Sequence, residues 1–155
     1  MKIVSWNSNG YFSERFPAIL EERADIYIIQ ECENPVVMDS EDYTEFASNY
    51  FWVGDNQKYG LGIFAKDNVK IELVDLDDKG LRYFIPVSVN DDVNLLGVWT
   101  NPNIEGRKEI YYPKEITRYY EEHRDSGFFN EEMSRLYFHH SLIIVLCIFI
   151  LAPIH

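Results

Sequence analysis

Two short apolar runs near the start of the chain each end in a compact polar motif. Asn7 follows the run at residues 2–6, and Glu31 follows the run at residues 24–30. A helical segment that opens at Ser13 separates the runs, so the pattern predicts a right-handed strand–helix–strand unit with parallel strands. Polar side chains just past the carboxyl ends of adjacent parallel strands converge on one crevice, where α/β sheets bind ligands. The sequence therefore predicts an α/β fold in which Asn7 and Glu31 share a site.

The chemistry of these two side chains favours a metal ion. A carboxylate and an amide offer the oxygen ligands that hard divalent cations take in proteins, so we predict a site for Mg²⁺ or Mn²⁺ at Glu31 and Asn7. Two simpler interpretations stay open. Glu31 can be a solvated acid at a strand end, and Asn7 can be a turn former, since the segment 8–10 that follows it is Ser-Asn-Gly.

Downstream of this unit the sequence predicts one more helix and then a series of strands. The helix occupies residues 40–49, with Ser40 as its N-cap. Turn signals, the first at residues 55–56, separate extended runs at residues 50–54, 61–65, 69–74, 83–89 and 93–100. This spacing predicts an antiparallel meander added to the parallel unit. A helix from Pro113 to about residue 123 comes after it.

The end of the chain has a different character. Residues 134–155 contain no Asp or Glu, and residues 142–151 are unbroken apolar sequence. A membrane-spanning helix needs ~20 mostly apolar residues, so membrane insertion is not expected, and the run favours an edge or core strand. We divide the chain into a domain over residues 1–133 and a tail over residues 134–155 that we expect not to belong to the fold.

Composition narrows the classes of partner and compartment. The net charge is −12, and the sequence has no Lys/Arg cluster, so an extended grip on the nucleic-acid backbone is not expected. Two cysteines give no disulfide framework and favour a reducing compartment. Because the first residues also lack the apolar core of a signal peptide, we expect a cytoplasmic protein. Cys32, placed between two glutamates, is interpreted as a packing residue.

Three motifs in a fixed order resemble a known superfamily. Asn7 after a first strand, the Gln-Glu pair at residues 30–31 after a second, and the Gly-rich segment 60–66 resemble the endonuclease/exonuclease/phosphatase (DNase I-like) superfamily over roughly residues 1–103. The resemblance implies a four-layer α/β sandwich, in which helices flank two packed mixed sheets. It also implies Mg²⁺-dependent hydrolysis of a phosphodiester or phosphomonoester, with Glu31 holding the metal and Asn7 orienting the metal or a bridging water. Asn103 is a candidate phosphate contact by the same resemblance.

The chain departs from this superfamily in its second half. Relatives carry a Gly-Asp-x-Asn motif for the nucleophilic water and a terminal Ser-Asp-His for the phosphoryl oxygen, and this sequence has neither. We therefore predict an incomplete sandwich, truncated or changed in reading frame near Met133.

Three hypotheses of function follow from the sequence. The first is a metal-dependent hydrolase that is inactive in this form and reaches a phosphorylated substrate or a nucleic acid through its metal. The second is a non-catalytic remnant that binds a metal or a partner. The third is an acidic binding module with a membrane-associating tail.

Overall fold

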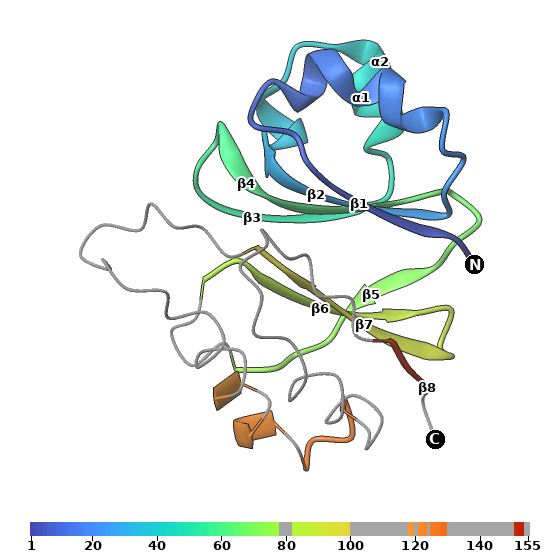
Figure 1. Cartoon of the computed structure of the whole chain (residues 1–155), viewed down its shortest axis with the longest axis vertical. Helices are drawn as coiled ribbons and strands as arrows, with labels where there is room; N and C mark the ends of the chain where they lie inside the picture. Colours follow the sequence, from blue (N-terminus) through green and yellow to red (C-terminus); the bar gives the residue numbers. More distant parts are fainter. Residues whose placement is uncertain (78–81, 100–117, 120, 124, 130–150, 154–155) are drawn as a thin grey trace.

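The computed structural model describes residues 1–77, 82–99, 118–119, 121–123, 125–129 and 151–153. Two four-stranded sheets lie face to face, and two short helices cover the outer face of the first sheet (Figure 1). The first sheet contains parallel and antiparallel pairs, and every pair in the second is antiparallel. The predicted α/β class is therefore confirmed.

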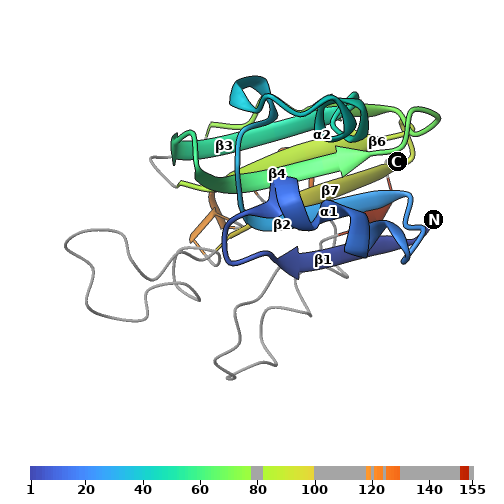
Figure 2. The same ribbon diagram turned by 90° about the horizontal axis from the view of Figure 1, so that it is seen from above.

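The first sheet contains the predicted parallel unit. Its strands occur in the order β1-β2-β4-β3, and their bounds are β1 Ile3–Asn7, β2 Ile26–Cys32, β3 Tyr50–Asn56 and β4 Tyr59–Ala65. β1 and β2 are parallel, with Asn7 opposite Gln30 at their carboxyl ends. Helix α1 (Phe12–Leu20) connects them and lies over the sheet (Figure 2). Both strand ends therefore face the same edge of the sheet, as the crossover predicts.

The hairpin β3–β4 corrects one sequence prediction. The predicted turn at residues 55–56 is wrong, because β3 continues to Asn56, which pairs with Tyr59. The turn is instead at Gln57 and Lys58, where the Lys58 amide donates to Asn56 Oδ1 at 3.0 Å. This side-chain bond stabilises a turn that lies two residues later than the Asp-Asn pair at residues 55–56 predicted. β4 then lies between β2 and β3.

The predicted single meander is divided between the two sheets. The chain leaves the first sheet after β4, and the second sheet has the order β5-β6-β7-β8. Its strands are β5 Ile71–Leu73, β6 Phe84–Val89, β7 Val93–Val98 and β8 Leu151–Pro153. β8 comes from the end of the apolar tail and pairs with β7, Leu151 opposite Leu95. Residues 142–150 lie outside the described residues.

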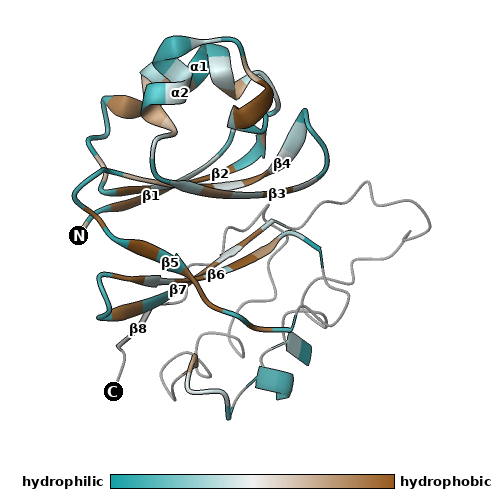
Figure 3. Cartoon of the chain, turned by 180° about the vertical axis from the view of Figure 1, so that it is seen from behind, coloured by the Kyte–Doolittle hydropathy of each residue, from teal (hydrophilic) through white to brown (hydrophobic). Residues whose placement is uncertain are grey.

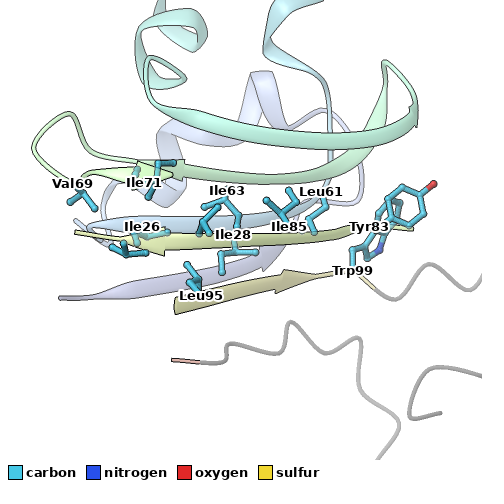
Figure 4. Packing of buried hydrophobic residues seen from close by; sticks show 13 residues of the cluster. Ile26, Ile28, Leu61, Ile63, Val69, Ile71, Tyr83, Ile85, Leu95 and Trp99 are labelled. Carbon is cyan, nitrogen blue, oxygen red and sulfur yellow. The ribbon is translucent and has the colours of Figure 1, made fainter. Parts of the chain in front are cut away.

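Strands of both sheets carry hydrophobic residues, brown in Figure 3, and the buried side chains of one cluster come from both sheets. Ile28 and Ile63 from the first sheet and Leu95 from the second have almost no exposed surface and lie in this layer (Figure 4). A second cluster fills the space between the first sheet and the helices, with Phe12 and Tyr43 at its centre. The first sheet is thus covered by an apolar layer on each of its faces.

The second helix begins where the sequence predicts. α2 (Glu41–Phe46) has Ser40 as its N-cap, and Ser40 Oγ accepts from the Tyr43 amide at 3.3 Å. It follows the short 3₁₀ helix η1 (Pro35–Val37) and ends three residues before the predicted boundary. Of the predicted helix at residues 113–123, only 118–119 and 121–123 are described, and these are helical. Within the described residues, no helix is both long and apolar enough to cross a membrane.

Candidate metal centre

The two residues singled out in the sequence are in direct contact. Asn7 ends β1, Glu31 lies one residue before the end of β2, and Asn7 Nδ2 donates to Glu31 Oε1 at 3.0 Å. Both residues are partly exposed, so solvent and a small ligand reach them. The carboxyl ends of parallel strands therefore bring the amide and the carboxylate together, as expected for this edge of an α/β sheet.

The backbone of Glu31 adopts an unusual conformation. Its φ is +58°, in the left-handed region, and the pairing of β2 with β4 shifts register between Gln30 and Cys32. A non-glycine residue in this conformation costs about 1–2 kcal/mol. Two donors hold its carbonyl oxygen, Ser8 Oγ at 3.0 Å and the Gly10 amide at 3.1 Å. The bulge redirects the Glu31 side chain, and bulges of this kind are common beside active sites.

Asn7 also forms the turn that the simpler interpretation assigned to it. Its Oδ1 accepts from the Asn9 amide at 2.9 Å, while its Nδ2 contacts Glu31. Both polar atoms of the amide are thus engaged, so Asn7 is suited to orienting Glu31 more than to binding a cation directly. The described residues donate no hydrogen bond to Glu31 Oε2, which leaves that oxygen for a ligand.

Glu33, two residues after Glu31, is bound to the start of helix α1 and was not identified from the sequence. It is 8% exposed, and its carboxylate accepts from the Ser13 amide at 3.1 Å and the Ser13 hydroxyl at 3.4 Å. Ser13 lies in the first turn of α1, where backbone amides attract negative charge. This contact joins residues 20 positions apart, and no local pattern in the sequence signals it.

Cys32 is a packing residue, as predicted. It is fully buried, and its carbonyl accepts from Trp52 Nε1 at 3.2 Å. Burial, and then the charge of Glu33, raises the pKa of the Cys32 thiol far above its ordinary value. The thiol is therefore protonated at neutral pH and cannot act as a nucleophile or a soft metal ligand.

This burial gives a first testable prediction. In a Cys147→Ser background, Cys32 should react with 5,5′-dithiobis(2-nitrobenzoate) at least ~100-fold more slowly in the native protein than in 6 M urea, since a buried protonated thiol is inert. Absorbance at 412 nm measures the reaction. Rapid labelling without denaturant, with the far-UV circular dichroism unchanged, would contradict the buried position of Cys32.

The donor set fits a weakly held hard cation. Among the described residues, no group of three or more His, Cys, Asp or Glu side chains gathers at one point. Glu31 is then the charged ligand that the described residues offer next to Asn7, and water would complete the coordination shell. Mg²⁺ commonly binds in this way, through one or two carboxylates and several waters.

The third predicted residue, Asn103, lies outside the described residues. The end of the preceding strand, β7, can however be placed relative to Asn7 and Glu31. Trp99 and Tyr83 lie at the same end of the sandwich as Leu61 (Figure 4), and Leu61 is opposite Gln30 in the first sheet. β7 therefore ends on the side of the molecule that carries Asn7 and Glu31.

A hollow on the first sheet is separate from this site. It has a volume of about 540 Å³ and lies between the helices and the sheet, with Phe16, Tyr27 and Phe46 among its lining residues. Ala65 also lines it and is opposite Ile26, at the amino end of β2. The hollow is thus at the other end of the strand from Glu31.

Comparison with known proteins finds a likeness among solved structures. No family model matches the chain, and no curated protein matches it. A solved 3′-5′ exonuclease from Neisseria meningitidis is similar, with a TM-score of 0.49 and 20% sequence identity. The similarity covers 82% of this chain and 54% of the exonuclease chain, so this chain spans about half the length of that structure.

Proposed function

We propose that Glu31 and Asn7 form the metal-binding half of a phosphoester hydrolase site that takes Mg²⁺ or Mn²⁺. The observation that carries the proposal is the 3.0 Å contact between Asn7 Nδ2 and Glu31 Oε1 at the carboxyl ends of two parallel strands. A carboxylate with one oxygen held by an amide, and the other without a hydrogen bond from the described residues, is a suitable arrangement for a hard cation. The superfamily that the sequence motifs resemble supplies the class of reaction.

In this proposal each residue has one role. Glu31 Oε2 would hold the cation, and Asn7 would fix the carboxylate through Oε1. A bound divalent cation would polarise a phosphoryl oxygen and stabilise the charge that develops on it. The substrate would be a phosphodiester or phosphomonoester, reached through the cation, because the chain carries a net charge of −12 and no basic cluster. Asn103 would contact the phosphate.

A second candidate is a metal or partner site without catalysis. The donor set favours it, because Glu31 and Asn7 provide binding groups but neither a base for water nor an acid for the leaving group. Within the described part of the chain, no group of three or more His, Cys, Asp or Glu side chains gathers to hold a metal. Metal binding is common to both candidates, and turnover distinguishes them.

Titration calorimetry tests the shared step. We expect saturable binding of Mg²⁺ with a Kd on the order of 10⁻³ M, since few protein ligands contribute. Glu31→Ala should weaken it by about tenfold or more, equivalent to about 1.4 kcal/mol. The control is Glu72→Gln, which removes one charge from an exposed position on β5. Equal heats from all three proteins would mean that only diffuse attraction to the acidic surface exists.

A further inference from the structure

The left-handed backbone conformation of Glu31 is strained, so contacts with neighbouring residues must maintain it. Ser8 is the residue best placed to do so, because it is 1% exposed, follows β1 directly and contacts Gln30 and Glu31 in the last part of β2. We propose that Ser8 is the positioning residue of the site, holding the Glu31 backbone in the left-handed conformation that aims its carboxylate at Asn7. The metal-binding consequence rests on the proposed function, whereas the effect on the Asn7–Glu31 contact does not.

The contacts of Ser8 support this role. Its hydroxyl lies 3.0 Å from the Gln30 carbonyl oxygen and 3.0 Å from the Glu31 carbonyl oxygen, so one proton is shared between them. Its amide donates to the Gln30 carbonyl at 3.0 Å. Without the hydroxyl, the Glu31 carbonyl keeps the Gly10 amide as a donor and the Gln30 carbonyl keeps the Ser8 amide, so a hydrogen bond shared by the two carbonyls is lost. Loss of the hydroxyl should therefore favour a return of the Glu31 backbone to the extended conformation of the rest of β2.

Arg15 extends this set of contacts into helix α1. Its Nη1 donates to the Ser8 carbonyl oxygen at 2.7 Å. The turn that carries Ser8 is therefore fixed to the helix on one side and to the bulge of β2 on the other. Arg15, Ser8 and Glu31 form a continuous series of hydrogen-bonded groups that ends at Asn7.

Ser8→Ala tests the proposal without metal. In ¹⁵N–¹H spectra we expect the side-chain amide of Asn7, assigned by its loss in Asn7→Ser, to move toward the shift of a solvated amide in Ser8→Ala. The matched control is Ser5→Ala, which removes a hydroxyl on β1 that accepts from Gln30 Nε2 at 3.2 Å. If Ser8 contributed only to stability, both variants would lower the urea midpoint of unfolding and leave the Asn7 amide resonance unshifted. That result would overturn the proposal.

A second measurement follows the consequence for metal binding. Electron paramagnetic resonance measures the concentration of free Mn²⁺ and therefore gives the Kd. We expect the Kd of Ser8→Ala to be three- to tenfold higher than that of the wild type, and the Kd of Ser5→Ala to be within twofold of it. If the wild type binds Mn²⁺ and Ser8→Ala binds it with the same Kd, the metal-binding consequence is overturned. If the wild type shows no saturable binding, the proposed function fails, and the Asn7 resonance alone decides the role of Ser8.

Arg15→Met keeps the proposal testable if Ser8→Ala does not fold. Arg15 is exposed, and methionine preserves its apolar stem while removing the donor to Ser8. We expect the Asn7 amide to shift in the same direction as in Ser8→Ala and the Kd for Mn²⁺ to rise about twofold. An Asn7 resonance that does not move in Arg15→Met would then count against the proposal.

Discussion

The chain should hydrolyse bis-p-nitrophenyl phosphate with Mg²⁺ no faster than the metal ion alone in buffer. Glu31 and Asn7 can hold a cation, but the sequence has no Gly-Asp-x-Asn or Ser-Asp-His motif to supply the remaining groups. General acid–base catalysis is typically worth ~10²–10⁴-fold. Loss of an electrostatic partner for the phosphoryl oxygen costs another ~10²–10³-fold. A combined loss of about 10⁴-fold or more would place any turnover below detection.

Nitrophenolate release at 400 nm measures this rate. The decisive comparison is between the wild type and Glu31→Ala, each with and without a chelator. Robust turnover that the chelator abolishes and that Glu31→Ala lacks would show that the chain carries a complete site. The non-catalytic alternative would then be excluded.

Phe12→Ala should have the largest effect on stability. Phe12 has no exposed surface, and its ring lies 5.7–5.9 Å from four other aromatic rings, namely those of Trp6, Tyr43, Phe46 and Phe64. Truncation of a buried phenylalanine costs about 3–5 kcal/mol through lost burial and the cavity left behind. We expect the free energy of unfolding, measured by urea denaturation, to fall by this amount.

Phe12→Leu is the matched control for that measurement. It keeps most of the buried volume and should cost less than about 1.5 kcal/mol if neighbours repack. A loss below about 1 kcal/mol in Phe12→Ala would mean that Phe12 is not the centre of the cluster beneath the helices. Phe12 begins helix α1, shortly after Asn7 in the chain. Loss of packing around Phe12 should therefore also disturb Asn7.

The parallel unit could be predicted from the sequence because its signals are local. The apolar run at residues 24–30 and the polar residue that follows it indicate a strand and its end without reference to any other part of the chain. Ser40 predicts its helix for the same reason, since an N-cap contacts an amide three residues away. The shared position of Asn7 and Glu31 follows from one rule about parallel strands.

Features that depend on distant partners could not be predicted in this way. The position of β4 between β2 and β3 is a long-range pairing that the turn signals along the chain do not specify. Glu33 reaches the first turn of α1 across 20 residues, and Ser8 reaches the Glu31 carbonyl across 23. The left-handed backbone of Glu31 is likewise a product of these contacts, since glutamate has no intrinsic preference for it.

The most direct test of the metal site is to locate bound Mn²⁺ by its paramagnetic broadening of amide resonances. With Mn²⁺ well below the protein concentration, we expect the amides of Asn7, Ser8 and Glu31 to broaden first, because broadening falls steeply with distance from the ion. Glu31→Gln should abolish this selectivity. Broadening that is spread over exposed acidic segments such as residues 41–42, and that is the same in Glu31→Gln, would contradict a metal site at Asn7 and Glu31.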